Sequence, residues 1–502
     1  MADRVSVDGG THRPGAPAEA LPARAGRRAP ATRPGTMSAL VAVTVLVGAE
    51  LLRVFPSLVA WQLGSTARLS VAAVVAVAVA PFVLTTVAAV AVATREPTVV
   101  LGVAGLVMSA ARLGVQVSDP DLAVLLAGVG LLAFLTTISV LALMALPLFG
   151  GGVVVGVVLD AAVRAALGTR DLAWIDEPWA VAAVAAIVTW HALLVLDRVR
   201  RPVELHGRDL AASLPLVALG PVLLVESFLL TNQGWVGEHL GVGWTGATAV
   251  IATAGVAGVV AAAATARRPD SWVPWLGVAG GIAIVALAGG GPLPGWWWAL
   301  GVLVAQAGVG SGLTTIATRG VGTGGRLTAA WAVALGHLLL LVALTAFDGR
   351  GVLGVALSPT ATVVAIGALL AGGTALARRR PAPRPHGAGG AQIPSLLVVV
   401  AAPMAALLIA LPVLSGVAGD AEGTGEPGFP VRVATYNVRL AFSADGRLNV
   451  EEVADALRPG APDIVGLQEV PRGHLRSGGV DMLGWLQRSL GLPYAAFQAA
   501  TP

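Results

Sequence analysis

The chain contains no cysteine, no lysine and little charge of either sign. Without cysteine it can form no disulfide, no thiolate zinc site and no cysteine nucleophile. Only 12% of its 502 residues are charged, whereas 56% are hydrophobic and the mean hydropathy is +0.80, an apolar share well above that of soluble domains. The composition therefore predicts a polytopic membrane protein. All 32 basic residues are arginine in a chain rich in Ala, Gly and Val, a bias that indicates a GC-rich bacterial genome.

The apolar runs predict the number of spans. Residues 1–36 combine Arg with Pro, Ala and Gly and show no apolar periodicity, which predicts a disordered cytoplasmic tail. The run that follows is long and has no small-residue cleavage site, so we interpret it as a retained helix and not a signal peptide. A spanning helix needs about 20 apolar residues. Thirteen runs qualify, near 38–60, 69–93, 98–117, 122–147, 150–168, 179–197, 211–231, 244–266, 272–290, 295–317, 328–347, 360–377 and 394–415.

Arginine placement predicts the orientation. With the N-terminus inside, the tail and the inside loops hold 19 arginines and the outside loops only three, as the excess of positive charge on cytoplasmic loops requires. The run at 150–168 is the weakest span because it contains Asp160 and Arg164, but deleting it would reverse every later loop. We therefore expect a multi-pass cell-membrane protein with a cytoplasmic N-terminus and with residues 416 onward outside the cytoplasm.

A change of composition divides the chain into parts. We expect a transmembrane domain over 37–415, a Gly-rich acidic linker over 416–430 that spans about 20 Å as a flexible coil, and a soluble part over 431–502. The soluble part alternates strand-like and helix-like segments: a strand at 431–438, a helix capped by Asn449, a strand at 463–467, a helix at 481–490 ended by Gly491 and a third strand at 494–498. This order predicts a layered α/β domain.

Asn437 and Glu469 fall at the carboxyl ends of the first two predicted strands, where ligands gather in sheets of this kind. A carboxylate suits a hard cation such as Mg²⁺, and an asparagine amide can donate to a phosphoryl oxygen. For either residue alone the simpler interpretation is favoured: Asn437 as a turn residue and Glu469 as a solvated carboxylate.

Taken with their neighbours, Thr435-Tyr436-Asn437 and Gln468-Glu469-Val470 resemble the first two motifs of the endonuclease/exonuclease/phosphatase superfamily. The longer match, including 445–449 and 463–470, is similar to bacterial relatives of the yeast cell-wall protein that remodels GPI-anchor lipids. The resemblance covers residues 431–502. It implies a four-layer α/β sandwich of the deoxyribonuclease-I type, with Asn437 contacting the scissile phosphate and Glu469 binding Mg²⁺ or Mn²⁺.

The later motifs of that family, an Asp and Asn pair and an Asp-His pair, have no counterpart in this sequence. His474, in a Gly/Ser/Arg loop, is not expected to be the catalytic base. The chain is therefore expected to be an inactive fragment, and the full-length protein a metal-dependent phosphoric ester hydrolase.

The membrane region offers separate candidates, because ionisable groups inside spans are costly and often functional. The possible intramembrane polar site comprises Glu50, Arg53, Asp160, Arg164, Glu226 and His337, and Arg112 and His191 also lie within spans. Glu50 with Arg53 and Asp160 with Arg164 have spacings that place each pair on one helix face, so mutual neutralisation is the favoured interpretation and a polar cavity for a lipid headgroup or solute is the alternative.

Two classes of function follow. The first is an extracytoplasmic, membrane-anchored phosphoesterase that acts on a lipid-linked or envelope phosphoester, with membrane lipids as partners. The second is a membrane transporter, or a scaffold for lipid remodelling, with an accessory non-catalytic soluble domain. Residues 431–502 hold seven Arg and seven Asp or Glu, so they form no basic surface of the kind that nucleic acid requires.

Overall fold

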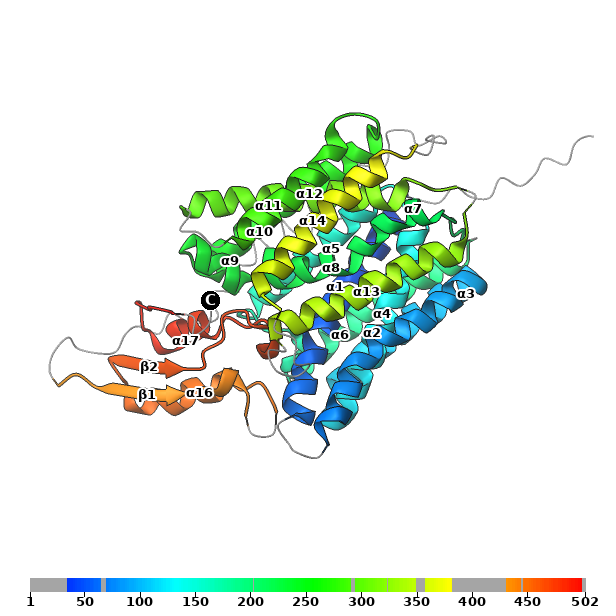
Figure 1. The fold of residues 1–502 in the computed structure, drawn as a ribbon. Helices are drawn as coiled ribbons and strands as arrows, with labels where there is room; N and C mark the ends of the chain where they lie inside the picture. Colours follow the sequence, from blue (N-terminus) through cyan, green and yellow to red (C-terminus); the bar gives the residue numbers. More distant parts are fainter. Residues whose placement is uncertain are drawn as a thin grey trace, which may run out of the picture. The chain divides into compact units, whose positions relative to one another are not determined.

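The fold is known from a computed structural model that describes residues 34–64, 69–201, 203–289, 294–322, 324–348, 357–381, 430–443 and 446–498. Within these ranges the chain forms a bundle of long helices and a small α/β region, labelled in Figure 1. The predicted tail at 1–36, apart from its last three residues, and the predicted span at 394–415 lie outside the described residues, as does almost all of the 416–430 linker.

The bundle confirms a multi-pass membrane protein. Eleven described segments are long and apolar enough to cross a membrane, and the predicted span near 272–290 is a shorter apolar helix. Five described helices begin with proline at their first position, where its missing N–H costs no hydrogen bond. The helices are α1 (Pro34–Leu58, continued by η1, Val59–Leu63), α2 (Val71–Thr94), α3 (Pro97–Val117), α4 (Pro120–Leu143), α5 (Phe149–Ala166), α6 (Pro178–Val199), α7 (Leu210–Ser213), η3 (Leu214–Ala218), α8 (Leu219–Val225), η4 (Glu226–Leu230), α9 (Gln233–Leu240), α10 (Trp244–Arg267), η5 (Val273–Trp275), α11 (Leu276–Ala288), α12 (Gly295–Thr318), α13 (Arg326–Asp348) and α14 (Pro359–Arg378).

The helices pack as two sets, which we name the first helix group (α1–α6) and the second helix group (α7–α14). In the first group α1 packs on α4, α5 and α6, and α3 packs on α4 and α6. In the second group α12 packs on α10, α11 and α14, and α8 packs on α13. The two groups meet where α2 lies along α13 and where α5 lies against α10 and α12. We call these contacts the seam.

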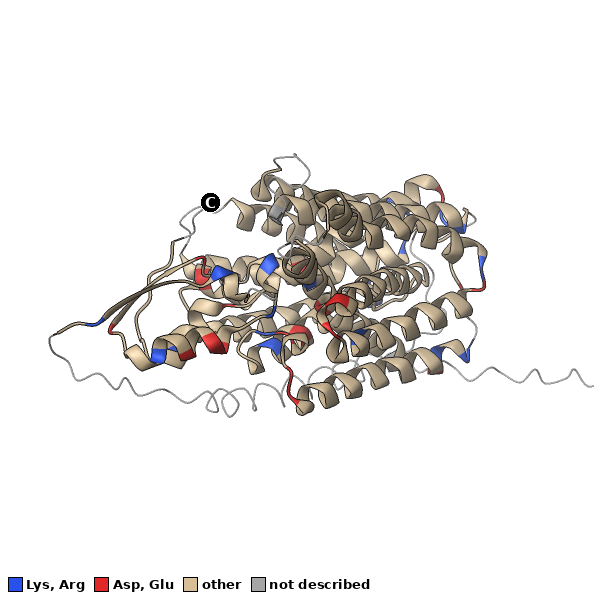
Figure 2. Ribbon diagram, turned by 90° about the horizontal axis from the view of Figure 1, so that it is seen from below, with Lys and Arg blue, Asp and Glu red and all other residues tan. Residues whose placement is uncertain are grey.

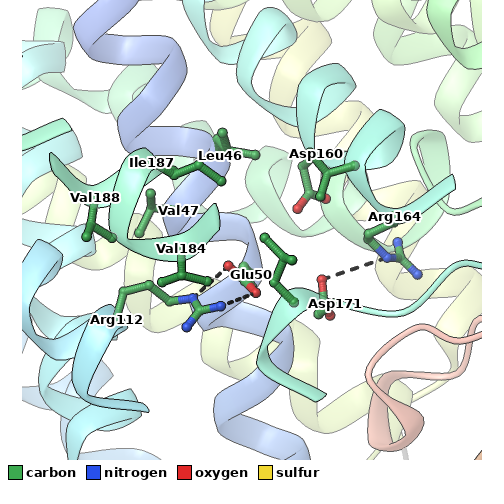
Figure 3. Close-up of a pocket in the computed structure, with 12 residues that line it drawn as sticks. Leu46, Val47, Glu50, Arg112, Asp160, Arg164, Asp171, Val184, Ile187 and Val188 are labelled. Atoms are coloured by element: carbon green, nitrogen blue, oxygen red, sulfur yellow. Dashed lines mark hydrogen bonds and ion pairs between the residues drawn. The ribbon is translucent and has the colours of Figure 1, made fainter. Parts of the chain in front are cut away.

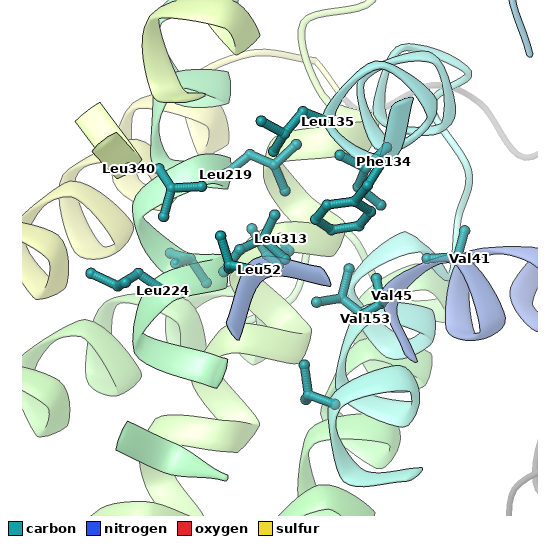
Figure 4. Close-up of a cluster of buried hydrophobic side chains, with 14 of the residues drawn as sticks. Val41, Val45, Leu52, Phe134, Leu135, Val153, Leu219, Leu224, Leu313 and Leu340 are labelled. Atoms are coloured by element: carbon teal, nitrogen blue, oxygen red, sulfur yellow. The ribbon is translucent and has the colours of Figure 1, made fainter. Parts of the chain in front are cut away.

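Buried apolar side chains from both groups meet in one cluster (Figure 4). Leu52 of α1, Leu135 of α4 and Val153 of α5 are fully buried, as are Leu219 of α8 and Leu340 of α13. The centre of the bundle is therefore an apolar core shared by the two groups.

Glycines set the closest helix crossings. A Cβ on Gly220 of α8 would lie 2.2 Å from the carbonyl oxygen of Gly336 of α13, and a Cβ on Gly280 of α11 would lie 2.4 Å from the Cα of Gly308 of α12. Small residues allow such close backbone contact between membrane helices, so these positions require glycine.

The described C-terminal part has two parallel strands, β1 (Val433–Asn437) and β2 (Ile464–Gln468), paired with Asn437 opposite Gln468. Helices α16 (Val450–Leu457) and α17 (Met482–Leu490) place Val453 and Leu486 in a small core. The two predicted strands and two predicted helices are confirmed. The third predicted strand is wrong, because residues 494–498 form no strand and Tyr494 is 92% exposed. Among the described residues the sheet has two strands and is not a four-layer sandwich.

Candidate functional site

Charged side chains from three helices and a loop meet near the C-terminal ends of α1, α3 and α5. We call this set the polar network; Figure 3 shows five of its members around a small cavity. Every one of them is buried. Its members are Glu50 and Arg53 of α1, Arg112 of α3, Asp160 and Arg164 of α5, and Asp171 of the loop between α5 and α6.

Glu50 is held by a helix other than its own. Arg112 donates from Nε and Nη2 to the two carboxylate oxygens of Glu50, at 2.7 and 2.6 Å. This two-point geometry is the strong form of an arginine–carboxylate pair. Glu50 also accepts a hydrogen bond from the backbone N–H of Ala173. The pairing of Glu50 with Arg53 expected from their spacing is therefore wrong.

Arg53 is shared between two carboxylates. Its Nη2 donates to Asp160 at 2.6 Å and to Asp171 at 2.7 Å, and its Nε donates to the second oxygen of Asp171 at 3.2 Å. A guanidinium between two buried carboxyl groups offsets the repulsion between them. Arg53 is therefore the central residue of the polar network.

Arg164 points toward the loop and the C-terminal part. Its guanidinium donates to the backbone carbonyls of Thr169 and Gly479, and its Nε lies 3.9 Å from Asp171. No direct bond joins it to Asp160 among the described residues, so the second predicted pair within one helix is also wrong. The polar network nevertheless has equal numbers of basic and acidic side chains, with three guanidinium groups and three carboxyl groups.

The polar network fixes the loop at 167–177. Arg53 binds Asp171, Arg164 binds the carbonyl of Thr169, and the Gln116 side chain donates to the carbonyls of Leu172 and Ile175. Asp171 and Gln116 were missed by the sequence analysis, because a loop aspartate and a helix-end glutamine carry no signal of burial. The favoured interpretation of mutual neutralisation is correct in kind, but its partners lie on different helices.

A cavity of about 20 Å³ lies beside the network, lined by Glu50, Arg112, Asp160, Arg164 and Asp171 together with apolar residues. Among the described residues Oδ2 of Asp160 and Nη1 of Arg164 have no hydrogen-bond partner. A cavity of this size with a donor and an acceptor suits one water molecule.

Two further buried groups lie in the second helix group. Glu226 begins η4, a π-helical turn, and its Oε2 accepts from Gln306 of α12 at 2.7 Å. Its Oε1 and both ring nitrogens of His337 in α13 have no hydrogen-bond partner among the described residues. Leaving such groups unpaired in a buried place is costly, and π-helical turns often occur at functional sites. Glu226 and His337 are thus the predicted residues whose burial is least compensated.

His191 of α6 is compensated. It lies between the hydroxyls of Thr44 in α1 and Ser109 in α3, at 3.0 and 2.8 Å. This histidine is therefore part of the packing of the first helix group.

The opposite end of the bundle carries arginines that close loops. Arg208, between α6 and α7, is fully buried and donates to the carbonyls of Ile316 and Ala317 at the end of α12. Burial lowers the pKa of the Arg208 guanidinium to about 10, which leaves it charged at neutral pH. It holds residues 203–209 of the loop against the second helix group.

Three successive tryptophans at the start of α12 lie in different surroundings. Trp296 and Trp297 are exposed and stacked on each other, whereas Trp298 is buried against His239 and Trp235. A buried aromatic cluster therefore begins where the exposed pair ends.

Asn437 and Glu469 do lie together at the carboxyl ends of β1 and β2. The Asn437 amide donates to a carboxylate oxygen of Glu469 at 3.0 Å, and both side chains are exposed. Among the described residues no group of three or more His, Asp or Glu side chains could hold a metal ion. This geometry does not test the predicted contact of Asn437 with a phosphate. Nor does it test the predicted binding of Mg²⁺ or Mn²⁺ by Glu469.

Comparison with known proteins gives a fold likeness alone. No family model and no curated protein matches the chain. Similar solved structures include a major facilitator superfamily proton:xylose symporter (12% identity, 69% of this chain and 94% of that chain, TM-score 0.46). They also include a bacterial homologue of the iron transporter ferroportin in an outward-facing state (15% identity, 68% of this chain and 98% of that chain, TM-score 0.40). A third is the human organic anion transporter TETRAN (14% identity, 70% of this chain and 100% of that chain, TM-score 0.39). At these identities and TM-scores the chain is not assigned to their family.

These findings correct the resemblance drawn from residues 431–470. The similar structures are membrane transporters, and no family model supports an endonuclease/exonuclease/phosphatase domain. The predicted phosphoesterase, with its hydrolase class and its phosphoester substrate, is therefore wrong. Two strand-end residues and their neighbours were too short a pattern to carry that assignment.

Proposed function

We propose that this chain is a membrane transporter for a small polar solute, with the soluble part as an accessory. The observation that carries the proposal is Glu226, a fully buried carboxylate with one oxygen on Gln306 and the other without a partner among the described residues. Ionisable groups inside a membrane commonly mark the path of a substrate or ion. Glu226 is therefore the proposed binding group for the solute or for a coupled cation.

Transport requires that the two helix groups move relative to each other. In this conformation the apolar core shared by α1, α4, α5, α8 and α13 fills the middle of the bundle. A solute can pass only when that core separates along the seam, since packed side chains leave it no open route. This structure then represents a closed state.

The proposed orientation places the end of the bundle with the polar network outside the cytoplasm. Figure 2 shows basic residues at the end of the helices away from the C-terminal part. By their helix boundaries, Arg200, Arg267, Arg319 and Arg378 lie at the C-terminal ends of α6, α10, α12 and α14. Cytoplasmic loops collect such an excess of arginine, so the C-terminal part is proposed to be extracytoplasmic.

The test is a solute screen with the full chain in proteoliposomes. Charge movement on a supported membrane is recorded while sugars, amino acids, organic anions and inorganic phosphate are added in turn. The active solute is then tested on the variants Glu226→Gln and Glu226→Ala. We expect each variant to transport the solute at least 10-fold more slowly or to lose the coupling of transport to a cation. Glu451→Gln, an exposed acidic residue of the C-terminal part, is the control and keeps full transport. No transport of any solute by the wild-type chain would reject the proposal.

A disulfide across the seam tests the movement itself. A Cβ on Gly255 of α10 would lie 3.4 Å from the Cβ of Val158 of α5, close to the separation in a disulfide. The double variant Val158→Cys/Gly255→Cys should stop transport when oxidised and recover on reduction. A matched pair within the first helix group, Gly105→Cys/Val195→Cys, has its Cβ atoms 3.5 Å apart and should transport in both states. Equal transport by the two oxidised pairs would show that the seam does not open.

A further inference from the structure

Residues 473–482 of the C-terminal part lie against the end of the bundle that carries the polar network. We call this segment the strap. Ser477, Val480 and Met482 are fully buried, although the segment has little regular structure beyond the short turn η8 (Leu475–Ser477). Burial of an irregular segment requires partners for its backbone groups. The partners of the strap backbone lie in both helix groups.

The first helix group binds the strap at three backbone positions. The Trp61 indole donates to the carbonyl of Arg476 at 2.8 Å, Arg164 donates to the carbonyl of Gly479, and the Thr169 hydroxyl accepts from the N–H of Asp481 at 2.8 Å. These contacts are made through the backbone of the strap. They connect it directly to Arg164 of the polar network.

The second helix group binds the other end of the strap. Asn232, which caps α9, donates from Nδ2 to the carbonyl of Gly473 at 2.7 Å. The turn η8 packs against both α1 and α13, which belong to different groups. The strap therefore bridges the two helix groups at one end of the seam.

The fit is close because the strap contains glycines with left-handed backbone. Gly478 and Gly479 have φ values of 63° and 75°. A Cβ on Gly478 would lie 2.8 Å from the Trp174 indole nitrogen, and a Cβ on Gly479 would lie 2.8 Å from Nη2 of Arg164. Any larger residue would have to displace the bundle side chains and adopt a strained conformation.

We propose that the strap is a clamp that holds this end of the bundle shut and must detach before the two helix groups can separate there. The proposal rests on the proposed function, because it gives the transporter a control over opening at one end. The helix–helix contacts within each group are made without the strap, so its detachment leaves those contacts in place. Its detachment changes the spacing of the groups at this end alone.

The experiment measures the distance between the two helix groups by double electron–electron resonance between pairs of spin labels, with the protein in nanodiscs. The chain has no cysteine, so introduced cysteines are the only labelling sites. Val117→Cys at the end of α3 and Ala361→Cys at the start of α14 report the strap end, and both positions are exposed. Val99→Cys and Leu327→Cys, also exposed, report the opposite end.

The strap is loosened from the bundle side by Trp61→Phe/Asn232→Asp. Phenylalanine keeps the ring that stacks on Phe442 but loses the indole donor, and aspartate keeps the acceptor that caps α9 but loses the amide donor. Each lost hydrogen bond should raise amide exchange in residues 473–482 about 5-fold. A second variant, Gly479→Val, loosens the strap from its own side. Glu451→Gln removes a contact with Arg170 outside the strap and is the control.

Both strap variants should add a longer distance between positions 117 and 361, with no lengthening between 99 and 327, and the control should match the wild type. An exposed strap with unchanged distances would overturn the proposal. So would a strap that stays protected from exchange in both variants, because these contacts would then not be what holds it. The readout does not depend on a solute, so a longer distance in a chain that transports nothing would keep the clamp and remove the transporter.

Discussion

Arg53 is the residue on which the polar network depends, because a single guanidinium separates the carboxylates of Asp160 and Asp171. Its position near the end of α1 makes it reachable from a loop, and its five donors allow it to bind two partners at once. Removing the cation would leave two buried acidic groups facing each other.

We therefore expect Arg53→Met to destabilise the protein by about 3–5 kcal/mol, the usual cost of breaking a buried pair from one side. Adding Asp160→Asn and Asp171→Asn should restore most of that stability, because the buried charges are then gone. Thermal unfolding in detergent would measure both changes. Arg201→Met, which breaks the half-buried i,i+4 pair with Asp197, is the control and should change stability by no more than about 1 kcal/mol. A triple variant no more stable than Arg53→Met would refute this account of the network.

At this scale the sequence predicts which residues are buried and charged but not how they pair. Glu50 and Arg53, three residues apart, satisfy a local rule, yet each binds a partner more than 60 residues away. Partners such as Asp171 come from a loop whose polar residues are typical of a segment exposed to solvent. Only the packing of α1, α3 and α5 brings them together, and no periodicity in the sequence reports that packing.

At the scale of the helix, glycines divide into those that a neighbour requires and those that face open space. Gly280 of α11 meets the backbone of α12, whereas a Cβ on Gly372 of α14 would have no atom within 4 Å. Both lie in apolar helices with similar surroundings in the sequence. Their different roles follow from which helix lies opposite.

Gly280→Ala should therefore destabilise the protein by about 1–3 kcal/mol, because α11 and α12 must move apart. Gly372→Ala should be neutral or stabilising by up to about 1 kcal/mol, since alanine restricts the unfolded chain without meeting a neighbour. Midpoints of thermal unfolding, compared in the same detergent, would show the difference. Equal shifts for the two variants would contradict the crossing of α11 and α12 described above.

The helices themselves are the most predictable elements. Long apolar runs predict the described spans to within a few residues. Even α5, the weakest candidate, is a helix because its Asp160 and Arg164 find partners outside it. The predicted strand at 494–498 failed because it has no neighbouring strand among the described residues to pair with.

For the whole molecule, the absence of native cysteine allows the proposed orientation to be tested directly. Tyr494→Cys lies on the exposed C-terminal part, and Gly322→Cys lies in an exposed loop at the arginine-rich end. A membrane-impermeant maleimide should label position 494 in intact cells and position 322 only after lysis. The wild-type chain, which has no thiol, is the control for background labelling. The reverse pattern would place the C-terminal part inside the cell.

The function of the whole molecule was the least predictable property. Asn437 and Glu469 meet at the strand ends as expected, but two residues in contact do not define a reaction. Asn232 and Trp61, which bind the strap, carry no signal in the sequence, because an asparagine cap and a tryptophan at a helix end are common in any membrane protein.

The polar network also has a consequence for biosynthesis. Arg53 enters the membrane with α1, but Asp171 lies 118 residues later, which at about 5–20 residues per second is a delay of roughly 6–24 s. Arg112, the partner of Glu50, is made 62 residues after it, but Arg53 waits 107 residues for Asp160 and 118 for Asp171. The nascent chain must keep α1 near a polar surface or an insertion factor until α5 and its loop emerge, so the lifetime of an unassembled first helix would set the yield of the folded protein.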